Sequence, residues 1–182
     1  MNNKKEIEFR GILGKKQYFD LLKKLISRGY AHEKDDKISY FFVRKKGIFK
    51  INDEISKNQA KISLKLGDEE NGKLYESEVS LDRRHFNDLL FIFQKLGFTK
   101  YHKVEQKRDN FLLKDFDVEL SLKYTLDFQY HFEIEYLGNK IKSENKIKKY
   151  LKEVCDKFNI VPLEEKELLQ RIQDIKKKHR LH

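Results

Sequence analysis

Three segments of the chain repeat a Glu-x-Glu pattern. They are Glu6 and Glu8 in EIEFR, Glu76 and Glu78 in YESEVSL, and Glu133 and Glu135 in HFEIEYL. Residues two apart in an extended strand project from the same face, so each pair presents two carboxylates together. Oxygen atoms of this kind are the preferred ligands of hard divalent cations. A chain with 30 acidic residues among 182 forms some such pairs by chance, so the interest lies in what surrounds them.

Basic residues alternate with apolar ones on other strand-like segments. These basic residues are Arg10, Lys50, Lys61, Lys65 and Arg108. Guanidinium and ammonium groups bind phosphate oxygens, so cations and carboxylates on one face would describe a site for a metal ion and a polyphosphate. Periodicity alone leaves two orientations open: a solvated outer face, or the lining of a polar cavity.

Composition narrows the class of protein. Hydrophobic and charged residues each make up 38% of the chain, 14 Phe and 9 Tyr argue against disorder, and the net charge of +10 favours a polyanionic partner. The single Cys155 excludes an internal disulfide and a cysteine metal cluster. The sequence has neither an apolar run of membrane-spanning length nor an apolar signal core, so we expect a cytoplasmic protein without a membrane partner.

The pattern of the chain predicts a strand-rich α+β protein. Alternation and β-branched or aromatic content predict strands over 4–11, 37–45, 47–53, 59–66, 73–81, 100–108, 110–115, 117–125 and 128–137. Helical spacing of apolar residues predicts helices over 15–28, 83–96, 143–158 and 163–179. So many antiparallel strands with few helices indicate a barrel or a strongly curled sheet.

The charged segments, taken in order, resemble the CYTH superfamily of triphosphate tunnel metalloenzymes. EIEFR resembles its N-terminal Glu-x-Glu-x-Lys strand, with Arg10 at the lysine position. Five further segments resemble later strands of the family in the right order: FKIND, AKISLKLG, YESEVSL, VEQKRDNF and HFEIEYL. No single motif is specific, but the ordered set is, and it spans roughly residues 5–137.

The resemblance implies a fold and an activity. The expected fold is one domain over 1–182: a closed, antiparallel, eight-stranded barrel over about 4–137, flanking helices, and a helical tail over about 143–179. The implied function is hydrolysis of nucleoside, thiamine or inorganic triphosphate with Mg²⁺ or Mn²⁺. A class IV adenylate cyclase that makes cyclic AMP from ATP is the alternative, and a homodimer is a candidate assembly.

The same resemblance implies roles for individual residues. Metal ligands would come from Glu6, Glu8, Glu76, Glu78, Glu133 and Glu135. Phosphate would be held by Arg10, Lys50, Lys61, Lys65 and Arg108. Among these residues, Glu8, Glu135 and Lys65 are the expected catalytic group.

The chain departs from the family pattern at several positions. Asn52 replaces the second Arg of one strand, Gln106 replaces a Lys, and Lys123 takes the place of an Asp. Because Asn52 and Gln106 leave fewer cations to bind phosphate, the sequence favours a second hypothesis, a module that binds a nucleotide or polyphosphate without turning it over. Nucleic acid is not the expected partner, because the aromatic residues alternate with the charges and fall on the opposite strand face.

Three further residues, His131, Glu119 and Cys155, fall outside the assigned set. His131 would share a face with Glu133 and Glu135, and Glu119 suits either a solvated edge or the polar lining. Cys155 falls at an apolar position of a helix and is expected to be buried and inert.

Overall fold

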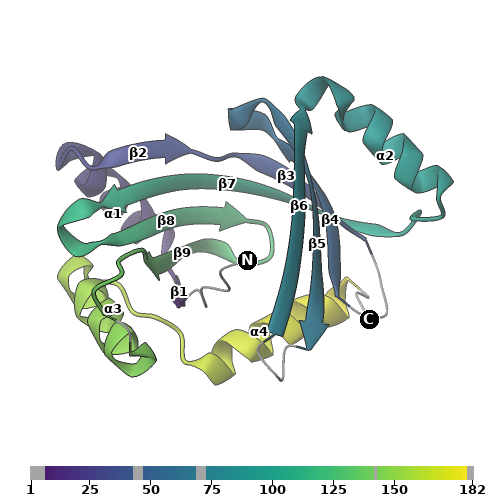
Figure 1. Ribbon diagram of the computed structural model, residues 1–182. Helices are drawn as coiled ribbons and strands as arrows, with labels where there is room; N and C mark the ends of the chain where they lie inside the picture. The colour runs from purple at the N-terminus through teal and green to yellow at the C-terminus, as the bar shows by residue number, and fades with distance from the viewer. Residues whose placement is uncertain (1–6, 43–46, 69–72, 142, 180–182) are drawn as a thin grey trace. The chain divides into compact units, whose positions relative to one another are not determined.

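The computed structural model describes residues 7–42, 47–68, 73–141 and 143–179, and the chain divides into two compact units (Figure 1). Unit 1 comprises Met1–Lys34 and Arg108–Gln170, and unit 2 comprises Asp35–Lys107 and Arg171–His182. Within the described residues, no helix has the length and apolar character needed to cross a membrane.

Unit 1 is an antiparallel sheet covered by two helices. Its strands are β1 (Glu8–Ile12), β9 (Gln129–Tyr136), β8 (Val118–Thr125), the second half of β7 (Tyr101–Leu113) and β2 (Ala31–Lys34), in that order. Its helices are α1 (Lys15–Ser27) and α3 (Glu144–Phe158), and α4 (Glu165–Lys178) begins in this unit. A short 3-10 turn, Lys114–Phe116, joins β7 to β8.

The core of unit 1 lies between the helices and one face of the strands. Leu25 of α1 and Leu151 of α3 are fully buried in the same cluster as Leu120 of β8 and Ile134 of β9. Because side chains alternate along a strand, the intervening residues of β8 and β9 must project from the opposite face. Packing of the apolar face therefore decides which face carries the charges.

Unit 2 has the same two-faced design. Its strands are the first half of β7, β3 (Lys37–Phe42), β4 (Ile48–Glu54), β5 (Gln59–Asp68) and β6 (Lys73–Asp82), in that order. Two 3-10 turns, Ile55–Lys57 and Arg83–His85, follow β4 and β6, and α2 (Phe86–Lys95) comes next. Phe42, Phe49 and Phe86 form an aromatic core with Phe93 of α2 packed against it.

The strands follow a single hydrogen-bonded order, β1-β9-β8-β7-β3-β4-β5-β6, with β2 on β7. In the parts of the chain that the structure describes, no ladder pairs β1 with β6, so hydrogen bonds do not close the sheet. The α+β class, the large antiparallel sheet and the C-terminal helices are confirmed, whereas the closed barrel is not. The single domain over 1–182 stays a prediction.

Two features of β7 and β2 differ from the expectation. The two strands predicted over 100–108 and 110–115 are one strand, because Asp109 and Asn110 at the expected break pair in register with β2. Asp109 contacts His32 Nε2 at 2.7 Å, and the Ser121 hydroxyl donates to Asn110 Oδ1 at 2.8 Å. The segment AHEK of β2 is exposed throughout and has no apolar alternation, so it carried no strand signal.

Gly11 tests the packing of β1 against unit 1. A Cβ atom at Gly11 would lie 2.3 Å from the Phe132 ring and 2.4 Å from the Val161 carbonyl oxygen, whereas one at Gly14 would meet nothing within 4 Å. We expect Gly11→Ala to lower the free energy of unfolding by about 2–3 kcal/mol. Gly14→Ala should change it by less than about 1 kcal/mol. Urea unfolding of both variants measures the difference, and equal values would contradict the close packing.

Candidate active site

The charged face of unit 1 carries three carboxylates side by side. Glu8 on β1 pairs in register with Glu135 on β9, and Glu135 pairs with Glu119 on β8. Like charges on directly opposed positions repel each other, so this row requires cations beside it. Arg10 donates to Glu8 Oε1 at 2.7 Å, and Arg108 lies 3.1 Å from Glu119 Oε1. The row is thus flanked by a guanidinium on each side.

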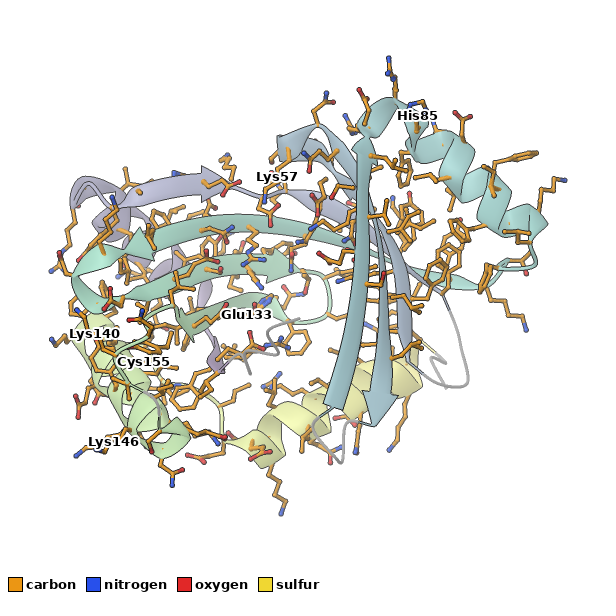
Figure 2. The ribbon with its side chains drawn as sticks, viewed as in Figure 1. Lys57, His85, Glu133, Lys140, Lys146 and Cys155 are labelled. Carbon is orange, nitrogen blue, oxygen red and sulfur yellow. The ribbon has the colours of Figure 1, made fainter. Side chains whose placement is uncertain are left out.

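The neighbouring row is built around Glu133. Arg10 Nε lies 3.1 Å from Glu133 Oε1, and the Lys123 ammonium contacts Oε2. The side chains of Glu133 and Lys123 are only 17% and 6% exposed. Both carboxylate oxygens of Glu133 are therefore engaged by cations, in a largely buried setting. Figure 2 labels Glu133 among the strands of unit 1.

Burial and charge shift the pKa values of this pair. Burial lowers the pKa of the Lys123 ammonium to about 8, although the Glu133 carboxylate acts in the other direction. Burial alone would raise the pKa of the Glu133 carboxyl, but the charges of Lys123 and Arg10 outweigh it and hold that pKa at about 2. Glu133 is therefore an anion at neutral pH, and its charge is fixed by its neighbours.

His131 completes this face next to Lys123. It pairs in register with Lys123 and is buried, and its Nδ1 lies 2.9 Å from the Gln129 carbonyl oxygen. Burial lowers the pKa of the imidazole below its ordinary value, with a smaller opposing effect from that hydrogen bond. His131 therefore adds a neutral ring, not a cation, to the charged face at pH 7.

Arg108 is fixed by a network of polar groups. Its guanidinium donates to the Asn110 side-chain oxygen, to Ser121 Oγ at 2.9 Å and to Glu119 Oε1 at 3.1 Å. Ser121 and Asn110 are themselves buried. A guanidinium held by three partners is preorganised, so it loses little conformational freedom when it also binds an anion.

Unit 2 has its own charged face on the strands that carry its aromatic core. Lys61 Nζ lies 3.3 Å from Glu78 Oε2 and 3.8 Å from Glu54 Oε1, and the Ser63 hydroxyl donates to Glu78 Oε1 at 2.8 Å. Burial acts to raise the pKa of Glu78, but the Ser63 hydrogen bond and the Lys61 charge lower it below its ordinary value. Lys50 adds to this lowering and sits in register with Ser63.

Asn52 stands on the same face, in register with Lys61 and Ser39. It is only 3% exposed, and its side-chain oxygen has no hydrogen-bond partner among the described residues. A buried acceptor without a donor is costly, so this oxygen suits a donor from a ligand.

The predicted site residues separate by unit. Glu8, Arg10, Arg108, Glu133 and Glu135 share the charged face of unit 1. Lys50, Lys61 and Glu78 share that of unit 2. Lys65 and Glu76 are register partners on β5 and β6, but their side chains lie outside the described part of the chain, as does all of Glu6.

The sequence interpretation missed one central residue, Lys123, and left Glu119 undecided. The family pattern marks Lys123 only as a departure from an Asp, yet the structure shows it as the buried partner of Glu133. The signal that could have found both is the alternation in ELSLK, where Glu119, Ser121 and Lys123 fall on one face and two leucines on the other. Cys155 is buried as expected, and burial raises the pKa of its thiol to about 12.

No protein-family model matches the sequence, and no curated protein matches it either. Solved structures do match. The PH1012 protein of Pyrococcus horikoshii OT3 is 19% identical with a TM-score of 0.65, over 88% of this chain and 92% of its own. A proposed adenylate cyclase of Bacillus halodurans is 15% identical with a TM-score of 0.59, over 90% of this chain and 95% of its own.

A second proposed adenylate cyclase, from Vibrio parahaemolyticus, is 11% identical with a TM-score of 0.58, over 91% of this chain and 97% of its own. At these identities the likeness establishes the fold. This chain therefore shares the fold of these solved structures, and the chemistry has to be argued from the charged faces.

The Glu133–Lys123 pair gives a test of the site's electrostatics. We expect Glu133→Gln to lower the free energy of unfolding by about 3–5 kcal/mol, because it leaves a buried ammonium without its carboxylate. The double variant Glu133→Gln/Lys123→Met should recover most of that loss, since it buries no charge at these two positions. Urea unfolding at pH 7 measures both.

The control for this comparison is the exposed pair Lys103–Glu105, whose side chains approach to 2.7 Å. Glu105→Gln should leave the stability nearly unchanged, because solvent screens the pair. A double variant no more stable than Glu133→Gln would contradict the view that Lys123 and Glu133 stabilise each other.

Proposed function

We propose that this protein is a divalent-metal-dependent hydrolase of compounds that carry a triphosphate. The observation that carries the proposal is the charged face of unit 1, where Arg10, Lys123 and Arg108 stand next to a row of three carboxylates. Cations of this kind bind phosphate oxygens, and carboxylates bind the metal ion that accompanies a triphosphate. The fold shared with two proposed adenylate cyclases agrees with chemistry at a triphosphate.

Each unit carries side chains that are suited to bind phosphate. Arg10 and Arg108 carry forked guanidinium groups already oriented by carboxylate, hydroxyl and amide partners. Lys50 and Lys61 contribute ammonium groups on unit 2, and the family resemblance assigns the same role to Lys65. Guanidinium groups bind two phosphate oxygens at once, whereas ammonium groups act as point charges.

A divalent cation such as Mg²⁺ or Mn²⁺ fits one part of this face. Glu8, Glu135 and Glu119 are opposed in register on adjacent strands, and a divalent ion would relieve their mutual repulsion. When bound, such an ion would offset the negative charge that builds up on the phosphates. Glu133 does not fit, because Arg10 and Lys123 occupy both of its oxygens.

The proposed reaction is attack of water on the terminal phosphorus. Water forms a bond to phosphorus, the bond to the bridging oxygen breaks, and the released diphosphate keeps the electron pair. Glu135, the middle carboxylate of the row, would accept the proton of the attacking water at its side-chain oxygen. Arg10 and Arg108 would hold the phosphate oxygens in place while charge redistributes.

A class IV adenylate cyclase is the second candidate, and the buried oxygen of Asn52 favours it. An unpartnered acceptor on the face that carries Lys50 and Lys61 suits a hydroxyl or amino group of a nucleoside. Hydrolysis needs no such contact. Binding of nucleotide without any turnover would instead identify a binding module.

The first test is a substrate panel with Mg²⁺ or Mn²⁺. It contains tripolyphosphate, ATP, thiamine triphosphate and triphosphorylated RNA, with products separated by chromatography. Released phosphate supports the hydrolase, cyclic AMP identifies the cyclase, and bound nucleotide without product identifies the module. Homodimer formation and the cytoplasmic location remain predictions.

Replacement of a row carboxylate tests the assignment of the water-activating group. We expect Glu135→Gln to lower kcat at least about 100-fold, because an amide cannot accept the proton. Glu8→Gln should weaken metal-dependent activity as well. Steady-state phosphate release measures both, and Glu105→Gln, which changes an exposed carboxylate, is the control. Wild-type rates of phosphate release in Glu8→Gln and Glu135→Gln would show that these carboxylates have no role in the reaction.

Lysine replacements test the phosphate contacts on unit 2. We expect Lys61→Ala and Lys65→Ala each to raise KM for tripolyphosphate about 10-fold, since each removes one positive charge from the bound phosphates. Lys103→Ala, at an exposed position paired with Glu105, should behave as wild type. Unchanged KM and kcat for both replacements would contradict the assignment.

A further inference from the structure

We propose that the Lys123 ammonium serves at Glu133 as a built-in cation, which keeps a metal ion off this carboxylate and anchors substrate phosphate together with Arg10. This inference rests on the proposed function and makes it more specific. It implies that unit 1 takes one divalent ion, at the Glu8–Glu135–Glu119 row, and that part of its affinity for polyphosphate needs no metal.

The first argument is that Glu133 has no oxygen left without a cation. Arg10 Nε lies 3.1 Å from one oxygen and the Lys123 ammonium contacts the other. A metal ion at Glu133 would have to share an oxygen with one of these cations or displace it. Sharing places two positive charges side by side in a largely buried setting, and displacement leaves a buried cation without its carboxylate, so both are costly.

The second argument is the balance of charge around this carboxylate. Arg10 and Lys123 both contact Glu133, and Arg108 donates to Ser121, the register partner of Glu133. These neighbouring cations repel one another. A further divalent cation would add to that repulsion, whereas an anion would relieve it. The surroundings of Lys123 are therefore suited to a phosphate and unsuited to a metal ion.

The third argument concerns hydrogen-bond capacity. An ammonium group has three N–H donors, and Glu133 accepts from one of them. Lys123 is fixed on the central part of β8 and flanked by His131, which burial keeps neutral. A lysine so held presents its charge without a large loss of side-chain freedom on binding.

Metal stoichiometry gives the first half of the experiment. Titration of the whole protein with Mn²⁺, followed by electron paramagnetic resonance without substrate, should show one tight ion per chain. Lys123→Asp should add a second ion, because it replaces the ammonium with a carboxylate beside Glu133. Two equivalent ions in the wild type, or no additional ion in a folded Lys123→Asp variant, would overturn the proposal.

Anion binding without metal gives the second half. Calorimetric titration with tripolyphosphate in excess EDTA should show binding to the wild type and at least a 10-fold loss in Lys123→Met. Because Lys123→Met leaves Glu133 less compensated, the double variant Lys123→Met/Glu133→Gln provides a second measurement and should show the same loss. Lys140→Met, at an exposed lysine near Asp117, is the matched control.

The outcomes separate this inference from the proposed function. Absence of tripolyphosphate binding by the wild type in EDTA, or full binding by the double variant, would overturn the role of Lys123 even if the enzyme hydrolyses triphosphates. A further outcome is that the protein binds tripolyphosphate without metal, in a way that depends on Lys123, and yet turns over none of the substrate panel. That result would support the role of Lys123 in phosphate binding and contradict the proposed hydrolase activity.

Discussion

The organisation of both units depends on where strand alternation places charge. One face of each set of strands packs on an apolar core, formed with α1 and α3 in unit 1 and with α2 in unit 2. The other face then receives every second residue, and in this chain those residues are mostly charged or polar. Lys123 and Glu133 are nearly as buried as the core, so each requires an opposite charge within contact distance. Cross-strand pairing supplies it, because β8 and β9 place these side chains next to each other.

This pairing makes the charged faces rigid. Arg108 is held by a carboxylate, a hydroxyl and an amide from its own strand and from β8. Arg10 lies between Glu8 and Glu133. Groups fixed by a sheet are positioned more accurately than groups on loops, which is what binding of a multiply charged ligand requires. Stability and preorganisation therefore come from the same contacts.

The sequence predicted which charged residues share a strand face better than it predicted their partners. EIEFR and HFEIEYL show clear alternation, and Glu8 and Glu133 do project from the face opposite the core. Which cation meets which carboxylate depends on register between strands far apart in sequence, and alternation within one strand does not encode that. Lys123 was missed for this reason.

Closure of the sheet is implied by the family likeness, and the ladders between the described strands do not show it. Strand β2 was missed because its residues are exposed and polar and join the sheet only through pairing with β7. Both cases concern the edges of the sheet, where hydrogen bonding to a neighbour decides the structure and the local residue pattern is weak.

Stability alone does not account for the charged face of unit 1. Buried ion pairs gain Coulomb energy but lose hydration, and apolar residues of similar size would stabilise such a fold at least as well. The three opposed carboxylates of Glu8, Glu135 and Glu119 are unfavourable to one another in the absence of a ligand. A face that combines an excess of carboxylates in one row with an excess of cations in the next is costly on its own and favourable around a metal ion and a phosphate. The cost is therefore best understood as part of ligand binding.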